Sequence, residues 1–133
     1  MNLIELSDII ENTYQDITQA SVFRNSNLIN SKAVVYPVVA FDLIQIINNY
    51  QYSNYSFQFV LAKQMNSDFT EITEDYQNLI NIFEQGIRQL EEDDRIDVVY
   101  PVNYQCNSLK FADVNNVLVV DITLQVENTL ICE

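Results

Sequence analysis

The densest group of ionisable side chains is a run of acids in the second half of the chain. Glu91, Glu92, Asp93 and Asp94 are consecutive, and Asp97 follows closely. Carboxylates at this density could bind Ca²⁺ or Mg²⁺ through oxygen ligands, but a calcium loop needs a glycine for its sharp turn and a fixed ligand spacing. The run has neither. It therefore reads as a solvated surface segment, which can also serve as an interaction face.

Groups suited to catalysis are scarce. Histidine is absent, which removes the commonest acid–base group at neutral pH and the commonest metal ligand. Cys106 would need a basic partner to act as a nucleophile, and Cys106 and Cys132 do not have the spacing of a metal pair. We read both as buried or nearly buried thiols, with a disulfide as the less favoured alternative. A single glycine cannot build a phosphate loop. We expect a non-enzymatic protein with no cofactor and no metal.

Tyrosine supplies the other distinctive cluster. Tyr50, Tyr52 and Tyr55 lie close together among Gln, Ser and Asn residues. Stacking on nucleic-acid bases would lack its cationic partner. Burial at a protein interface suits an aromatic body with a polar tip, and ordinary packing within a loop is an equal alternative. The interface candidates are therefore Tyr50, Tyr52, Tyr55, Glu91, Glu92, Asp93 and Asp94.

Length and charge limit the class of protein. The 133 residues, 48% of them hydrophobic, suit one domain spanning 1–133 that folds without disulfide or metal. We find no apolar run of bilayer length and no secretory signal, and we expect a cytoplasmic site of synthesis. The net charge of −13, with only six scattered cations, repels nucleic-acid phosphates. Direct DNA readout is not expected, although an acidic wall would let DNA slide past.

The first half of the chain predicts a helix followed by a hairpin. Apolar residues at three- and four-residue steps predict an amphipathic helix from Leu3 to Ile17, and Ser21 to Lys32 reads as a connection. The stretch from Ala33 to Ile47 is rich in β-branched and aromatic residues and predicts a strand. A turn at Asn48 to Asn54 leads to an alternating strand that places Tyr55, Phe57, Phe59, Leu61 and Met65 toward a core, with Val60 as the exception.

The second half repeats this order. A helix is expected from Thr73 to Leu90, with Thr73 as its N-cap and the acidic run frayed at its end. Gly86, inside the helix, suggests close approach of a neighbouring backbone. A second hairpin pairs residues 98–106 with a closing strand at 118–126, around a turn near 113–116. The predicted fold is a single α+β domain of order α-β-β-α-β-β, with a mostly antiparallel sheet and two amphipathic helices packed on one face.

The sequence Val-Val-Tyr-Pro-Val occurs twice, at 34–38 and 98–102. Each copy is expected to open the first strand of a hairpin that follows a helix. Chance in a β-favouring composition, an internal duplication and a recurring way to start a strand are all compatible with the repeat. Proline cannot donate to a strand ladder, so Pro37 and Pro101 are expected at strand starts, edges or bulges. Tyr36 and Tyr100 are expected on the same side as the inward valines.

An acidic, glycine-poor chain with this order of elements resembles the head-to-tail joining proteins of tailed bacteriophages. It is most similar to the tail-terminator type, and its Asn-, Ile- and Tyr-rich composition resembles phages of gut Bacteroides, the crAss-like group included. The resemblance covers most of the chain as an order of elements: an N-terminal helix, a helix before the second strand pair, and a long alternating last strand. No signature motif contributes to it.

The resemblance implies a virion structural protein, made in the host cytoplasm and located in the neck or tail. Its copies would form a homo-oligomeric ring that joins head to tail, contacts portal, adaptor or tail-tube proteins, and surrounds the DNA channel. Contacts between subunits would run head to tail through sheet edges and loops. DNA would pass without sequence-specific binding, and no membrane is involved. The alternative from another class is a small acidic phage-encoded adaptor or inhibitor that binds a host protein by mimicking nucleic acid.

Overall fold

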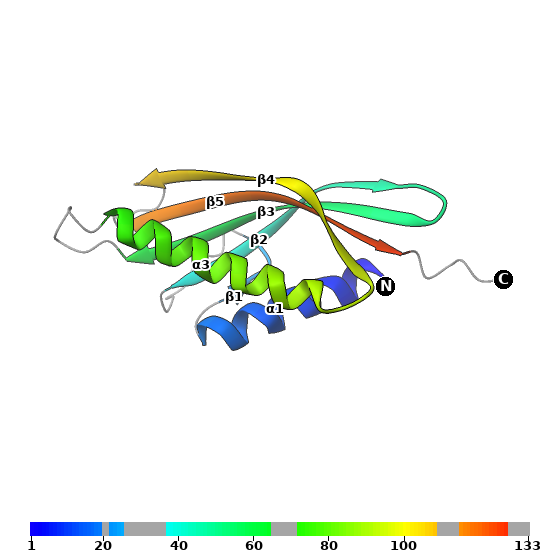
Figure 1. Ribbon diagram of the computed structural model, residues 1–133, viewed down its shortest axis with the longest axis horizontal. Helices are drawn as coiled ribbons and strands as arrows, with labels where there is room; N and C mark the ends of the chain where they lie inside the picture. The colour runs from blue at the N-terminus through cyan, green and yellow to red at the C-terminus, as the bar shows by residue number, and fades with distance from the viewer. Residues whose placement is uncertain (20–21, 26–36, 65–71, 109–114, 128–133) are drawn as a thin grey trace.

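A five-stranded mixed sheet carries both helices on one face (Figure 1). The computed structural model describes residues 1–19, 22–25, 37–64, 72–108 and 115–127. In chain order the elements are α1 (Leu3–Thr18), β1 (Val22–Phe23), β2 (Val38–Asn48), β3 (Tyr52–Gln64), α3 (Ile72–Glu91), β4 (Ile96–Ser108) and β5 (Asn115–Glu127). The sheet order is β1-β2-β3-β5-β4. The α+β class is confirmed, whereas the predicted order lacked one strand.

The missing strand is β1, which lies inside the stretch that the sequence predicts as a connection. Val22 and Phe23 pair parallel with Val39 and Ala40 of β2, and this pairing makes the sheet mixed. Two residues are too few to show an alternating pattern, so only the tertiary pairing reveals the strand. Residues 26–36, which include the rest of that connection and the first expected strand residues, lie outside the described residues.

Both hairpins form as expected, and they join through their second strands. β2 pairs antiparallel with β3, and β4 pairs antiparallel with β5. β3 then pairs antiparallel with β5 over its whole length, from Tyr52 opposite Glu127 to Gln64 opposite Asn115. This arrangement leaves β4 at one edge of the sheet. At the other edge β1 covers only Val39 and Ala40, so from Phe41 onward β2 has no described neighbour on its outer side.

The helices begin and end for local reasons. Asn2 caps α1 by accepting a 2.8 Å hydrogen bond from the backbone N–H of Glu5, and Gln19 ends the helix in the left-handed region with φ of 50°. The expected N-cap role of Thr73 is wrong, because α3 already begins at Ile72. Glu74 and Asp75 do lie in its first turn, where negative charge interacts favourably with the positive end of the helix dipole.

The main core lies between the helices and the sheet and is rich in aromatic rings. Phe59 stands at its centre, with ring centroids 5.3 Å from Phe83, 5.5 Å from Tyr14 and 5.6 Å from Phe41. Offset and edge-to-face pairs at these separations add to the hydrophobic gain. The prediction that Tyr55, Phe57, Phe59 and Leu61 face a core is confirmed. Met65, the last member of that row, lies outside the described residues.

A second apolar cluster lies on the opposite face of the sheet. It explains why Val60 interrupts the alternation of β3, and Ala62 and Val119 are buried on the same side. Both faces of the sheet are therefore buried at this end. The members of the cluster are Val38, Ala40, Val60, Ala62, Val117 and Val119, with Phe23 of β1 packed against them.

The two prolines of the repeated sequence occupy different environments. Pro37 lies directly before β2, and Pro101 lies inside the edge strand β4, where the pairing with β5 shifts between Val99 and Asn103. The expected placement at strand starts, edges or bulges is confirmed. The expected equivalence of the two copies is wrong, because β4 already begins at Ile96. Tyr36 lies outside the described residues.

Gly86 packs against a side chain rather than a backbone. The ring of Tyr14 on α1 occupies the space into which a Cβ atom at Gly86 would project. The expectation of a close approach at this position is thus confirmed, but the neighbour was wrongly assigned as backbone. Because Gly86 has no side chain, the large aromatic ring of Tyr14 can enter between the two helices.

Candidate functional site

The end of the first hairpin forms an exposed apolar projection, which we call the arm and define as residues 43–52. It extends beyond the ends of both helices at the right of Figure 1. Ile44 is 62% exposed and Tyr50 is 89% exposed. Further large exposed side chains on it are Leu43, Ile46, Ile47 and Tyr52. Contiguous exposed apolar surface of this kind marks interaction sites.

Both faces of the arm are apolar. Leu43 pairs with Phe57 and Ile46 with Tyr55, so these two side chains continue the core-facing side of the sheet. A register shift between Leu43 and Gln45 accommodates Ile44, and Ile47, one residue after Ile46, points to the opposite face. A hairpin with one apolar face would pack on its own domain. An arm with two apolar faces offers contact surface on both sides.

The tip of the arm is a defined turn. The side-chain oxygen of Asn49 accepts hydrogen bonds of 2.8 Å from the backbone N–H groups of Gln51 and Tyr52. The backbone N–H of Asn49 donates to the carbonyl oxygen of Tyr52 at 2.9 Å, and Ser53 bonds to Asn48 across the strands. Asparagine bonding to the backbone two and three residues on is typical of tight turns. The exposed tyrosines are thus presented on an ordered tip.

The three candidate tyrosines divide between surface and core. Tyr50 and Tyr52 are exposed on the arm, as an interface role requires. Tyr55 is only 7% exposed and belongs to the main core. Within the subunit its ring is packed and not exposed, because strand alternation turns it toward the helices.

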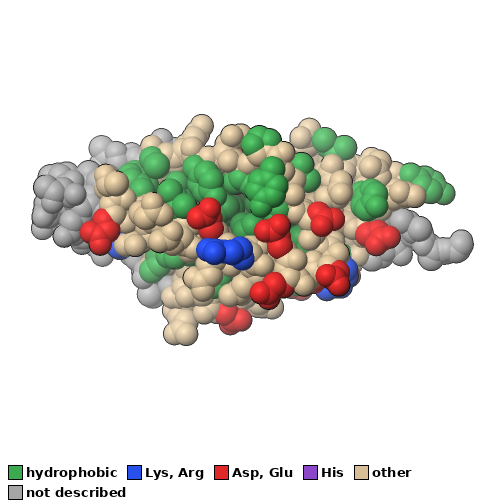
Figure 2. Space-filling model, in the orientation of Figure 1, with side chains coloured by type: hydrophobic (Ala, Val, Ile, Leu, Met, Phe, Trp, Pro, Cys, Tyr) green, Lys and Arg blue, Asp and Glu red, His purple; other side chains and the backbone are tan. Residues whose placement is uncertain are grey.

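A groove lies at the opposite edge of the sheet, between α3 and β4. It has a volume of about 610 Å³. Phe83 and Ile87 are buried and form its floor, while Tyr100 on the edge strand is 65% exposed. Figure 2 shows hydrophobic side chains gathered along this band of the surface, above a row of acidic side chains. The remaining lining residues are Glu84, Arg88, Glu91, Pro101, Val102 and Tyr104.

Charges of both signs lie on the α3 side of the groove. Glu84, Arg88 and Glu91 are exposed there, and the Arg88 guanidinium donates a 3.4 Å bond to the carbonyl oxygen of Glu84. Burial against the groove wall raises the pKa of the Tyr104 phenol, and the nearby carboxylate of Glu84 raises it further. The Tyr104 ring stands edge-on to Phe83 at 5.9 Å. The groove can accept apolar side chains and offers both charged and hydroxyl groups for polar contacts.

Most of the acidic run faces solvent, but one member has a structural role. Glu91 lies at the rim of the groove, and Glu92 and Asp94 are exposed. The carboxylate of Asp93 accepts from both the backbone N–H and the guanidinium of Arg95, at 2.9 Å and 2.7 Å, in the turn after α3. These hydrogen bonds lower the pKa of Asp93. The expected fraying is wrong because this turn is internally bonded.

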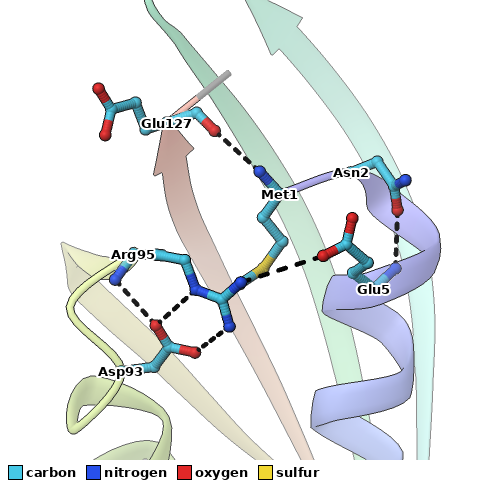
Figure 3. A network of polar contacts seen from close by, with 6 residues as sticks. All are labelled: Met1, Asn2, Glu5, Asp93, Arg95 and Glu127. Carbon is cyan, nitrogen blue, oxygen red and sulfur yellow. Dashed lines mark hydrogen bonds and ion pairs between the residues drawn. The ribbon is translucent and has the colours of Figure 1, made fainter. Parts of the chain in front are cut away.

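The Asp93 turn contacts α1, and the chain start bonds to β5 close by (Figure 3). Arg95 also faces Glu5 of α1 at 4.0 Å, and the Met1 amino group donates to the Glu127 carbonyl oxygen of β5 at 3.3 Å. Asp93 is therefore engaged with Arg95 within the subunit. Glu91, Glu92 and Asp94 keep free access to a partner.

Outside the arm and the groove, the described residues include few side chains that could react or bind a metal. Cys106 is exposed, so the expected burial of its thiol is wrong. It pairs with Leu118, whose side chain faces the main core, so its exposure follows from the edge position of β4. Cys132 lies outside the described residues. Within the described ranges, no three His, Cys, Asp or Glu residues gather as metal ligands. Neither described helix has the length and apolar composition needed to cross a bilayer.

Sequence reasoning missed the aliphatic part of the arm and the groove. The stretch from Leu43 to Ile47 looks like core strand, and its exposure depends on how far the helices extend over the sheet. One signal was available: Leu43 to Ala62 contains no Asp, Glu, Lys or Arg, the longest uncharged stretch in this acidic chain. Tyr100 and Tyr104 come together with Phe83 only through the packing of α3 beside β4.

A comparison with models of known protein families finds no match for this chain, and none of the curated proteins matches it.

Proposed function

We propose that this protein is a non-enzymatic structural subunit that assembles with copies of itself into a ring in the virion of a tailed bacteriophage. The ring would lie at the portal, neck or tail junction, join head to tail and surround the DNA channel. The observation that carries the assembly role is the arm, an ordered hairpin tip with exposed aliphatic side chains on both faces. In an isolated monomer these apolar side chains stay exposed to water, whereas a partner surface would bury them.

The positions of the arm and the groove support a ring rather than a closed pair. They are different surfaces, carried by β2 and β4 at opposite edges of one sheet. Contacts between unlike surfaces are head to tail, and they close into a ring when the rotation between subunits allows it. A twofold dimer would use one surface twice.

The charge supports a position around DNA. A net charge of −13 repels phosphates, so a ring of such subunits would form a channel wall that does not retain DNA as it passes. The location in a phage virion rests on the resemblance in element order.

Assembly and location can be measured separately. Mass photometry of the purified protein over a concentration series should show a discrete ring, or subunits that assemble when tailed particles are added. Proteomics of purified virions should contain the protein at a ring-like copy number, and labelled antibody should mark the head–tail junction in electron micrographs. A stable monomer or dimer that is absent from virions would contradict the proposal.

The same charge favours one alternative, a small acidic adaptor or inhibitor that occupies the nucleic-acid-binding surface of a host protein. Such a protein would act as a monomer or dimer and would be absent from virions. Its binding to a basic host partner would weaken steeply with added salt, because released counterions drive contacts of that kind. Ring contacts through the uncharged arm would not weaken in this way, because added salt screens the repulsion between acidic subunits.

A further inference from the structure

The groove is concave with an apolar floor, and the arm is a convex apolar element at the other edge of the same sheet. We propose that the arm of one copy docks in the groove of a second copy and adds a strand to the sheet beside β4. The inference rests on the proposed function, because it names the two surfaces by which subunits would meet. It also requires that each copy uses its arm and its groove toward different neighbours.

Strand edges provide the first match. Among the described strands, β4 pairs only with β5, and β2 beyond Ala40 pairs only with β3. Both therefore present backbone N–H and C=O groups on an outer edge, except that Pro101 in β4 has no N–H to donate. Unpaired edges are templates for strand addition, in which main-chain hydrogen bonds give affinity and side-chain pockets give specificity. A groove between an edge strand and a helix is suited to this mode, since the added strand bonds to one wall and packs on the other.

Side-chain chemistry provides the second match. The floor of the groove is formed by Phe83 and Ile87, and Tyr100 stands exposed at its wall. The arm presents isoleucines on either face, so whichever face turns inward supplies aliphatic side chains to this floor. Exposed tyrosines at the arm tip can then bond to rim groups with their hydroxyls. Apolar anchors surrounded by a polar rim are the usual anatomy of a protein interface.

Charge explains why an arm fits better than another part of the same chain. Two copies with a net charge of −13 each repel one another. The contact with the smallest electrostatic penalty is one in which an uncharged surface of one copy meets charges of both signs on the other. The arm lies within the uncharged stretch from Leu43 to Ala62, and the rim of the groove has Arg88 beside Glu84 and Glu91. An acidic segment of a second copy would face like charges there.

Contact between two arms is the main competing arrangement. It would close a twofold dimer and leave the groove exposed in both copies. Two convex hairpins also enclose less surface than a hairpin seated in a concave groove, and interface cores pack as densely as protein interiors. The two arrangements predict different behaviour of variants altered only in the groove.

The test uses three variants of the full chain. The arm variant carries Ile46→Glu and Ile47→Glu, one on each face of the arm. The groove variant carries Arg88→Glu and Tyr100→Glu, at two exposed positions. The control is Ile4→Glu, because Ile4 is also exposed and lies on α1, which contributes no residue to the arm or to the groove. Circular dichroism and thermal unfolding verify that each variant folds.

The arm variant and the groove variant should each raise the concentration at which assembly begins by about tenfold or more, as loss of central anchors does. The control should assemble like the wild type. Mixing the arm variant with the groove variant should give a complex of two chains and no larger species. In that mixture the intact arm of one chain meets the intact groove of the other. The pair then has no intact arm or groove left to bind a further chain.

Three results would overturn the inference. A groove variant that assembles like the wild type would show that arms contact each other or another surface. A mixture that stays monomeric would show that arm and groove do not meet, and so would a wild type that stays monomeric at millimolar concentration. The proposed function is judged separately, by the presence of the protein in virions.

Discussion

The phenol ring of Tyr14 fills the space beside Gly86, and its hydroxyl donates a 2.8 Å hydrogen bond to the carbonyl oxygen of Phe83. One aromatic side chain thus joins α1 to α3 across the core. Its ring also packs on Phe59 at 5.5 Å, so the contact extends from both helices to the sheet. The helix that forms the floor of the groove is held in place by this contact.

Gly86→Ala should destabilise the protein by about 1–3 kcal/mol, because the added methyl group overlaps the Tyr14 ring and forces it to move. Helix propensity alone predicts the opposite sign, a gain of about 1 kcal/mol. Urea unfolding followed by circular dichroism measures the difference. Gln85→Ala, on the exposed side of the same helix, is the matched control and should stay within about 0.5 kcal/mol of the wild type. In a Tyr14→Leu background the penalty of Gly86→Ala should shrink.

Stability should fall at alkaline pH, and Tyr14→Phe should reduce that fall. Burial raises the pKa of Tyr14 well above its usual value. The contribution of protonated Tyr14 to folding stability is therefore complete below about pH 10. Near that pH a tyrosine in the unfolded chain begins to lose its proton. It declines as pH rises further, because only the unfolded state deprotonates readily. Tyr104 and Tyr76 also have raised pKa values, so the variant should show a shallower slope. An unchanged slope would contradict the assignment.

Asp93→Asn should remove part of the loss of stability at acid pH. The hydrogen bonds from Arg95 lower the pKa of Asp93 in the folded state. Its contribution is present above about pH 4, the ordinary range of aspartate, and is lost as pH falls through the lowered folded-state pKa. Thermal unfolding between pH 2 and pH 7 checks this. Asp94→Asn, at the exposed neighbouring position, is the matched control and should stay within about 0.5 kcal/mol of the wild type at pH 7.

Two tyrosines close in sequence should respond in opposite ways to truncation. Tyr55→Ala should cost about 3–5 kcal/mol of unfolding free energy, since it removes a buried aromatic ring from the core. Tyr50→Ala should stay within about 0.5 kcal/mol, because its side chain is exposed at the arm tip. If Tyr50 contributes to subunit contacts, its variant should fold normally and assemble less well. Equal losses of stability would contradict the division between core and arm.

The exposed Cys106 offers a check on the geometry of the edge strand. Its thiol should react with a water-soluble disulfide reagent in the native protein, without denaturant, because β4 presents it to solvent. Cys106→Ser should abolish that phase of the reaction. Protection of Cys106 in the wild type, with reaction only after unfolding, would show that the thiol is buried as the sequence predicted.

Periodicity in the sequence predicted the strongly amphipathic elements. The stripe of Leu6, Ile10 and Tyr14 and the row of Phe57, Phe59 and Leu61 are buried as predicted. Helix and strand repeats place such residues on one side by local geometry alone. The sequence also determined the Asn49 turn and the positions of proline where a strand donor is missing, since both depend on backbone chemistry within a few residues.

Only the tertiary structure decided which strands pair and which apolar residues remain uncovered. Val22 and Phe23 become a strand because β2 lies beside them, and Val60 is buried because the second apolar cluster forms on its side of the sheet. Leu43 to Ile47 is as apolar as the strand before it, yet the arm is exposed because its end of the hairpin extends beyond the helices. The groove likewise needs α3 and β4 to meet. Burial depends on what lies opposite a residue in space, and the local pattern of a chain carries no information about that neighbour.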